Sequence, residues 1–382
     1  MSLNLEHLQI SAFRGIRDLE LSGLGAVNLF VGPNNSGKTS VLEAIATYCR
    51  PLDPTEWLGV ARRREVKSSR QPVFEGLRWI FPQFADRAGG AKQKDTVNGL
   101  YFGAVEMGGA GKHPVTRLRA ECDEFIAFDG LDEESSVDDW ESSEGEVVME
   151  LRISAHLPPA QWLSFNADAD SGVIHRTFEI RERPRFKPLL LNDAHQSPLL
   201  PVATVSPFAH RVEQLQVKLL SSLDDRKSLV TLLAMFDEDV LDLDIRSRSG
   251  TRSNLYLRHK RIGLAPLSAF GDGMRRAVTM ALSIASIPGG CLLIDEIETA
   301  IHVSALDKVI AWLIEAADLS NVQLFATTHS LEALDAIVDG VNGNVEKVVA
   351  YHLDSTPTES IARRFDGDLL HRLRFERGLD VR

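Results

Sequence analysis

The stretch of sequence that decides the fold is Gly32-Pro33-Asn34-Asn35-Ser36-Gly37-Lys38-Thr39-Ser40. It follows the apolar run 26–31, which is typical of a buried parallel strand, and residues 40–48, which begin with its last residue, are predicted to form a helix. Glycines at this spacing let successive backbone N–H groups point at one phosphate, and the helix adds its positive N-terminal end. A strand, a glycine-rich loop and a helix in this order predict a loop that binds the phosphates of ATP.

Two side chains of this loop are predicted to act on the nucleotide directly. Lys38 would neutralise charge on the β- and γ-phosphates, and the Thr39 hydroxyl would bind Mg²⁺. The backbone of the whole loop, residues 32–40, is expected to surround the phosphates. The alternative is a glycine turn without a ligand, which the flanking strand and helix disfavour.

Two further apolar stretches are predicted to be strands that end in polar residues. Residues 291–294 lead into Asp295 and Glu296. We expect Asp295 to hold Mg²⁺, directly or through water, and Glu296 to accept a proton from the attacking water. Residues 322–326 lead into a polar run in which His329 is predicted to bind the γ-phosphate or the attacking water, because ligands collect at this end of parallel strands. A solvated acid pair and a structural histidine are the alternatives.

A fourth motif opens the helix that is predicted over residues 273–286. Its sequence is Gly271-Asp272-Gly273, and the backbone N–H groups of such a helix start suit an anion. An ordinary helix N-terminus is the alternative interpretation.

In this order, the four motifs resemble the ABC-type ATPase heads of the RecF, SMC and OLD (overcoming-lysogenization-defect) group. The resemblance covers about residues 1–60 and 260–355. It implies that residues 271–276 are the ABC signature, that residues 294–298 are the Walker B motif, and that His329 is the switch histidine.

Two details of this resemblance concern contacts with the nucleotide. Phe13-Arg14-Gly15-Ile16 resembles the N-terminal strand turn of the group, which implies a nucleotide contact for Arg14. Gly271 stands where the signature usually has a serine, so its γ-phosphate contact would depend on backbone N–H groups. Gln71 and Gln83 are both weak candidates for the Q-loop glutamine of the group.

The predicted fold is α/β: an ABC-type P-loop ATPase head with a largely parallel central sheet, an N-terminal antiparallel β portion and a helical and β insertion. The predicted ATPase core is split between residues 1–60 and 260–355. Residues 61–260 would be an inserted region that senses a partner, with alternating strand patterns over residues 96–185 and helices over residues 208–236. Residues 356–382 are expected to be a short charged tail.

Charge and composition limit the partners. The chain has 54 acidic and 42 basic residues and a formal net charge of −12, which disfavours a protein that wraps DNA. DNA contact would need local patches such as residues 62–64 and 258–261. The acidic stretch 129–146 is predicted to be a solvated loop, with attraction of a basic partner as the alternative.

The remaining features predict a cytoplasmic protein that makes no membrane contact. The start of the sequence has no signal-peptide pattern, and no apolar run approaches the length of a membrane span. The three cysteines are an odd number without zinc-ligand spacing, which favours reduced thiols.

The resemblance implies hydrolysis of ATP to ADP and phosphate in a head-to-tail dimer. ATP on the loop of one subunit would be covered by residues 271–276 of the other. The 31 residues after Tyr351 leave no room for a Toprim nuclease domain, so we expect a stand-alone ATPase that works beside a separately encoded effector, such as a nuclease, in defence against phage. A RecF-like DNA-repair ATPase and a structural scaffold with little turnover are the two alternatives.

Overall fold

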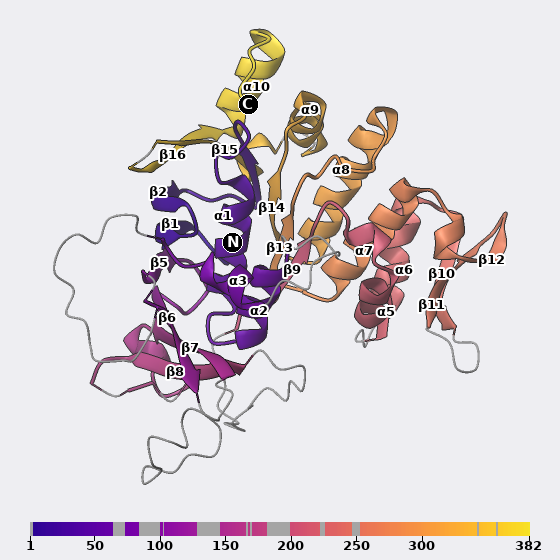
Figure 1. Cartoon of the computed structure of the whole chain (residues 1–382). Coiled ribbons are helices and arrows are strands. Elements are labelled where there is room, and N and C mark those ends of the chain that lie inside the picture. Colours follow the sequence, from indigo (N-terminus) through magenta and orange to yellow (C-terminus); the bar gives the residue numbers. More distant parts are fainter. Residues whose placement is uncertain are drawn as a thin grey trace. The chain divides into compact units, whose positions relative to one another are not determined.

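The computed structural model describes residues 3–63, 73–83, 100–101, 103–127, 146–165, 167–168, 170–181, 199–221, 226–246, 253–341, 344–356 and 358–382. The described residues form two compact units (Figure 1). The first unit contains Met1–His7, Glu20–Cys49 and Leu200–Arg382, and the second contains Leu8–Leu19 and Arg50–Leu199. The predicted acidic stretch, apart from Glu146, lies outside the described residues, as do Arg64 and Gln71.

A six-stranded sheet forms the centre of the first unit. Its strands, in spatial order, are β16 (Ser360–Asp366), β15 (Val348–Ser355), β3 (Val27–Val31), β14 (Gln323–Thr327), β13 (Cys291–Ile294) and β9 (Val202–Val205) (Figure 1). All neighbouring pairs are parallel except β15 and β16. Every residue of β3, β13 and β14 is buried, which explains why these strands are continuous apolar runs and not alternating ones.

Helices that follow or precede these strands complete the first unit. They are α1 (Lys38–Cys49), α5 (Glu213–Ser221), α6 (Arg226–Phe236), α7 (Asp272–Ala285), α8 (Val303–Leu319), α9 (Leu331–Gly340) and α10 (Gly367–His371). A separate antiparallel sheet consists of β10 (Val240–Arg246), β11 (Asn254–His259) and β12 (Gly263–Pro266). Apolar side chains from the central sheet and from α6 to α9 share one core cluster.

The second unit is built on an antiparallel sheet with the order β2 (Ile16–Ser22), β1 (His7–Phe13), β5 (Val105–Ala110), β6 (Arg117–Ala127), β7 (Glu146–His156) and β8 (Val173–Arg181). The short strand β4 (Leu100–Tyr101) pairs with β6. The unit also contains α2 (Pro54–Arg62) and α3 (Val73–Arg78). The largely parallel central sheet and the antiparallel β portion confirm the predicted α/β fold class.

The structure differs from the expected organisation at two places. Residues 200–260 were expected in the inserted region, but β9 lies at the edge of the central sheet because its four residues pair in parallel with β13. Residues 356–382 were expected to be a tail, but β16 pairs along its whole length with β15. Among the described residues, no helix has the length and apolar character needed to cross a membrane.

A buried glutamine fixes the start of the chain against the central sheet. The side chain of Gln323, 3% exposed, donates from Nε2 to the carbonyl oxygens of Leu5 (2.7 Å) and Gly25 (2.9 Å). Its Oε1 accepts the N–H of Leu5 at 2.9 Å. One side chain therefore satisfies three backbone groups that the fold has removed from water.

We expect Gln323→Leu to lower the free energy of unfolding by about 2–4 kcal/mol, because it leaves buried backbone groups of Leu5 and Gly25 unpaired. Urea denaturation followed by circular dichroism measures this change. Glu315→Leu, a polar-to-leucine change at an exposed position of α8, is the matched control and should stay within about 0.5 kcal/mol of wild type. Equal midpoints for the two variants would contradict the role assigned to Gln323.

Candidate functional site

The glycine-rich loop closes around the amine of Lys38. Lys38 Nζ donates to the carbonyl oxygens of Gly32 and Pro33, both at 2.8 Å. Gly32 has φ +140°, and a Cβ there would lie 2.2 Å from the carbonyl oxygen of Leu353, so only glycine fits without displacing the backbone. Asn35 and Gly37 also have positive φ, which turns the loop into a concave backbone ahead of α1.

The environment of Lys38 has opposing effects on its ionisation. Burial lowers the pKa of its amine, and the nearby carboxylates of Asp295 and Glu296 act in the opposite direction. The cation therefore lies in a partly dehydrated place in which an anion such as a phosphate would be strongly attracted.

Asp295 joins the phosphate loop to the ends of two strands. Its carboxylate accepts hydrogen bonds from the Thr39 hydroxyl (3.2 Å to each oxygen) and from the Thr327 hydroxyl (2.7 Å). The structure thus brings together the two residues predicted to bind metal. A hydroxyl and a carboxylate are hard oxygen ligands, and one or two protein ligands are what Mg²⁺ takes beside nucleotide phosphates, so this donor set fits the ion.

Glu296 has a backbone conformation that costs energy. Its φ is +47°, in the left-handed region that residues other than glycine seldom occupy. The Glu296 N–H donates to the Thr327 hydroxyl at 2.8 Å, and its Oε2 accepts from the Thr299 hydroxyl at 3.0 Å. The surrounding contacts therefore hold this residue in a strained turn directly after β13.

The loop after β14 is fixed by an acid that the sequence motifs left without a role. Glu298 accepts the Thr328 hydroxyl at 2.8 Å and the His329 N–H at 2.9 Å. His329 is exposed, and its carbonyl oxygen accepts Arg382 Nη1 at 2.9 Å. The predicted switch histidine is thus placed by Glu298 on one side and by Arg382 on the other.

Two contributions were missed by the analysis of the sequence, those of Thr327 and Glu298. A signal existed for Glu298, because it is the third acid within four residues of the end of β13, where a run of solvated acids next to an apolar strand would be unusual. The sequence contained a weaker signal for Thr327, because a threonine at the end of a strand is common. Its hydrogen-bond partner Asp295 lies 32 positions earlier in the chain, so their contact is not visible in the local sequence.

The predicted signature motif lies at the start of α7. Gly271 caps the helix without a side-chain hydrogen bond, and a Cβ on Gly271 would meet no atom within 4 Å. The Asp272 carboxylate pairs with Arg275 at 3.1 Å and with Arg211 at 3.4 Å. The helix end therefore offers open backbone N–H groups, although Asp272 opposes the approach of an anion.

Arg14 and Gln83, the possible Q-loop glutamine among the described residues, belong to the second unit. Arg14 has φ +51°, and its guanidinium donates to the carbonyl oxygens of Val60 (3.2 Å) and Trp79 (3.4 Å). Gln83 donates to the carbonyl oxygens of Arg78 and Phe81. A contact between Arg14 and the nucleotide stays a prediction.

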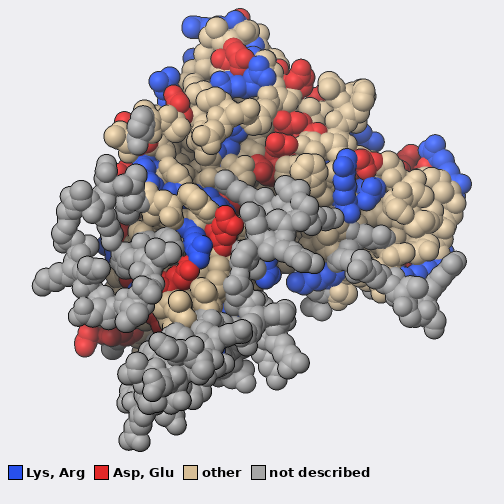
Figure 2. Space-filling model, viewed as in Figure 1, with Lys and Arg blue, Asp and Glu red and all other residues tan. Residues whose placement is uncertain are grey.

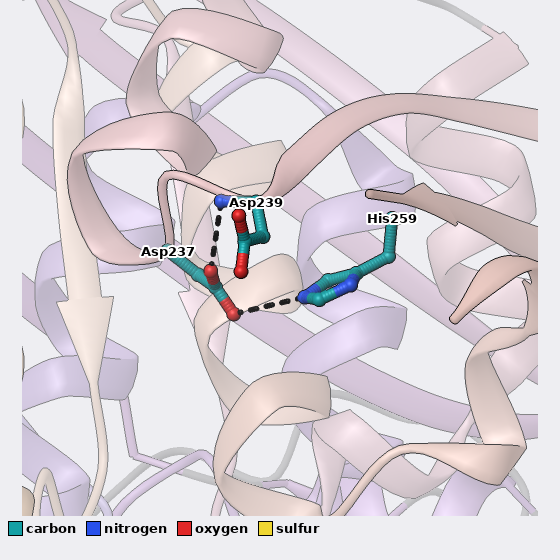
Figure 3. A group of neighbouring side chains, drawn as sticks. All are labelled: Asp237, Asp239 and His259. Carbon is teal, nitrogen blue, oxygen red and sulfur yellow. Dashed lines mark hydrogen bonds and ion pairs between the residues drawn. The ribbon is translucent and has the colours of Figure 1, made fainter. Parts of the chain in front are cut away.

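A second group of side chains, in the first unit, has the composition of a metal site (Figure 3). The possible ligand atoms of Asp237, Asp239 and His259 lie within 4.8 Å of one another. However, His259 Nδ1 accepts the N–H of Arg261 (3.2 Å), so the neutral ring carries its proton on Nε2, which faces Asp237 at 3.5 Å. A metal-binding imidazole needs the opposite arrangement. Arg261 also pairs with Asp239, so we interpret the group as an ion-paired turn.

Comparison with known proteins identifies the kind of protein to which this site belongs. Residues 129–335, more than half of the chain, match the family described as "AAA domain, putative AbiEii toxin, Type IV TA system". The chain belongs to this family.

Several proteins resemble this AAA-domain family member over different lengths. An ATP/GTP phosphatase of Helicobacter pylori is 21% identical over 367 residues, which cover 87% of this chain and 88% of that protein. The DNA replication and repair protein RecF of Nitrosococcus oceani is 35% identical over 109 residues, 28% of this chain and 25% of RecF. One uncharacterized protein of Methanocaldococcus jannaschii is 38% identical over 69 residues, which are 18% of this chain and 60% of that protein. A second uncharacterized protein of the same organism is 48% identical over 44 residues, which are 12% of this chain and 20% of that protein. The chain thus spans less than two thirds of the length of each of these two relatives.

Among solved structures, the SMC head bound to the C-winged helix domain of ScpA aligns with a TM-score of 0.42 and 12% identity, over 98% of this chain and 99% of that chain. The SMC head domain from Thermotoga maritima aligns with a TM-score of 0.41 and 13% identity, over 95% and 100%. The family match supports an ATPase-type P-loop domain, whereas the SMC-, RecF- and OLD-like features stay predictions.

We expect Gly32→Ala to weaken ATP binding by about tenfold or more, because the strained φ and the contact with the Leu353 carbonyl together cost at least ~1.4 kcal/mol. Titration with a fluorescent ATP analogue measures the affinity. Gly59→Ala in α2 is the control, since a Cβ there meets no atom within 4 Å, and its affinity should equal that of wild type. If Gly32→Ala binds as tightly as the control, the loop is not the nucleotide site.

Proposed function

We propose that this AAA-domain family member binds ATP·Mg²⁺ on the 32–40 loop and hydrolyses it to ADP and phosphate. The observation that carries this proposal is the convergence of Lys38, Thr39, Asp295 and Glu296 at one edge of the central sheet. No other group of described side chains combines a glycine-rich backbone, a buried cation and adjacent carboxylates.

The residues of the site divide the chemistry between them. Lys38 and the backbone N–H groups of the loop bind phosphate oxygens, and Thr39 and Asp295 hold the ion, which would neutralise charge that develops on the phosphates. Glu296 accepts the proton of the attacking water. His329 orients that water or the γ-phosphate.

The N-terminal end of α7 is proposed to act on the nucleotide of a second copy of the chain. Gly271, Asp272 and Gly273 would close over ATP in a head-to-tail dimer, with Arg14 as a further nucleotide contact. The open space around Gly271 supports this role, since a phosphate could approach the backbone there. ATP then favours the dimer by binding it more tightly than the monomer, and hydrolysis releases it.

We further propose that this dimerisation controls a separately encoded effector, such as a nuclease, in defence against phage. The family description, which names a putative AbiEii toxin and a Type IV TA system, supports a protein that works beside an effector. We place the protein in the cytoplasm.

A RecF-like function in DNA repair is the second candidate, and the 35% identity to RecF over 109 residues favours it. The basic residues 258–261 support it weakly, because Lys260 and Arg261 already pair with Asp239. On the face drawn in Figure 2, the described Lys and Arg side chains are interspersed with Asp and Glu and form no broad basic surface. A scaffold with little turnover is the third candidate.

We expect Glu296→Gln to bind ATP with unchanged affinity, to hydrolyse it about 10²–10⁴-fold more slowly and to accumulate as a dimer, because only the proton acceptor is lost. Phosphate release and light scattering, each with and without ATP·Mg²⁺, measure turnover and mass. Glu315→Gln, at an exposed position of α8, is the control and should behave as wild type.

Normal hydrolysis by Glu296→Gln would show that this residue is not the proton acceptor. If the mass in solution were the same with and without ATP·Mg²⁺, ATP would not control dimerisation, and the scaffold with little turnover would be favoured. DNA binding with a steep dependence on salt concentration would favour the RecF-like function.

A further inference from the structure

Arg276 is a charged side chain that the fold buries completely. It lies in α7, five positions after Gly271, and is 0% exposed. Its hydrogen bonds go to four backbone carbonyl oxygens. They are those of Ser206 (2.6 Å), Pro207 (3.2 Å), Asp295 (3.3 Å) and Glu296 (3.2 Å).

These four carbonyl groups belong to the ends of two neighbouring parallel strands. Ser206 and Pro207 follow β9 directly, and Asp295 and Glu296 follow β13. Nη1 binds the strand end after β9 and Nη2 binds the strand end after β13, an arrangement that suits the two separate nitrogen atoms of a planar guanidinium better than the single nitrogen atom of a lysine. Arg276 therefore connects α7 to the segment that carries both predicted Walker B acids.

Burial of the charged guanidinium costs desolvation free energy, so a gain in stability alone does not explain this arrangement. Dehydration lowers the pKa of Arg276 to about 10, although Asp295, Glu296 and Glu298 favour the charged form. The side chain is still charged at neutral pH. Because an apolar side chain of similar volume often stabilises a buried position as well as an ion does, packing alone gives little reason for an arginine here.

The hydrogen bond from Arg276 is the second of two that fix the backbone of Glu296. Thr327 accepts the N–H of Glu296 on one side of the strained residue, and Arg276 binds its carbonyl oxygen on the other. Both backbone polar groups of Glu296 are thus fixed, and the direction of its carboxylate follows from them.

We propose that Arg276 is a positioning residue that couples the N-terminal end of α7 to Glu296. This inference depends on the proposed function, in which that end of α7 binds the ATP of a second subunit. An ATP molecule that orders α7 from the neighbouring subunit would then order Glu296 at the chain's own site through the Arg276 guanidinium. The two ATP sites of the dimer are therefore cooperative in turnover.

The test compares Arg276→Lys and Arg276→Met with wild type, each alone and combined with Glu296→Gln. Arg363→Lys, at an exposed position of β16, is the matched control. ATP affinity, kcat, KM, the Hill coefficient of turnover and the thermal midpoint are measured for each protein. The lysine variant keeps the charge, so it decides the test if the methionine variant does not fold.

We expect Arg276→Lys to lower kcat about 10–100-fold, to change KM less than about threefold and to reduce the Hill coefficient to one, because Glu296 is no longer fixed. In the Glu296→Gln protein the same change should lower the residual turnover no further, since the group it positions is absent. A lower thermal midpoint with unchanged kcat would overturn the inference, as would an equal loss in both backgrounds.

Hydrogen exchange tests the coupling without changing Arg276. In the Glu296→Gln protein, ATP·Mg²⁺ should protect the amides of residues 272–276 and 295–299 together. Protection of residues 272–276 alone would overturn the coupling but leave the proposed ATPase intact. Undiminished hydrolysis by Glu296→Gln would instead remove the proposed function, so the two failures are distinguishable.

Discussion

The Asp295 carboxylate is the point at which three segments of the first unit meet, and the arrangement of the site depends on it. Thr39 approaches it from the start of α1 and Thr327 from the end of β14, while β13 carries it. A carboxylate only accepts hydrogen bonds, so both hydroxyls must donate to it, and this fixes the phosphate loop relative to both strand ends. Glu296 follows in a left-handed backbone conformation, which its contacts with Thr327 and Thr299 stabilise.

Two buried cations set the backbone on either side of these acids, and they do so in the same manner. Lys38 binds the carbonyl oxygens of Gly32 and Pro33, and Arg276 binds those of the strand ends after β9 and β13. In both places the charge is satisfied by main-chain oxygens, while the Asp295 and Glu296 carboxylates receive hydroxyl donors. Both positive side chains thus shape the backbone, and Lys38 is in addition the proposed phosphate ligand.

Much of this arrangement followed from local patterns in the sequence. The loop at 32–40 and strands β3, β13 and β14 were predictable because continuous apolar runs end at glycine or polar residues, and the same holds for the placement of Asp295 and Glu296. Strand β9 was not predictable, since it has four residues and becomes a strand only by pairing with β13. The roles of Thr327 and Arg276 depend on contacts between segments distant in the chain, which no local spacing reveals.

The hydrogen bond from Arg382 to the carbonyl oxygen of His329 affects how the protein can be labelled for experiments. Arg374 holds the same terminal segment to α9 through two bonds to Asp335, and Val381 is buried in the core. A purification tag or fusion partner joined after Arg382 would therefore emerge beside the loop that carries His329. Its bulk and charge would press on the backbone of that loop, so a group joined there would shift the predicted switch histidine without any change in the sequence.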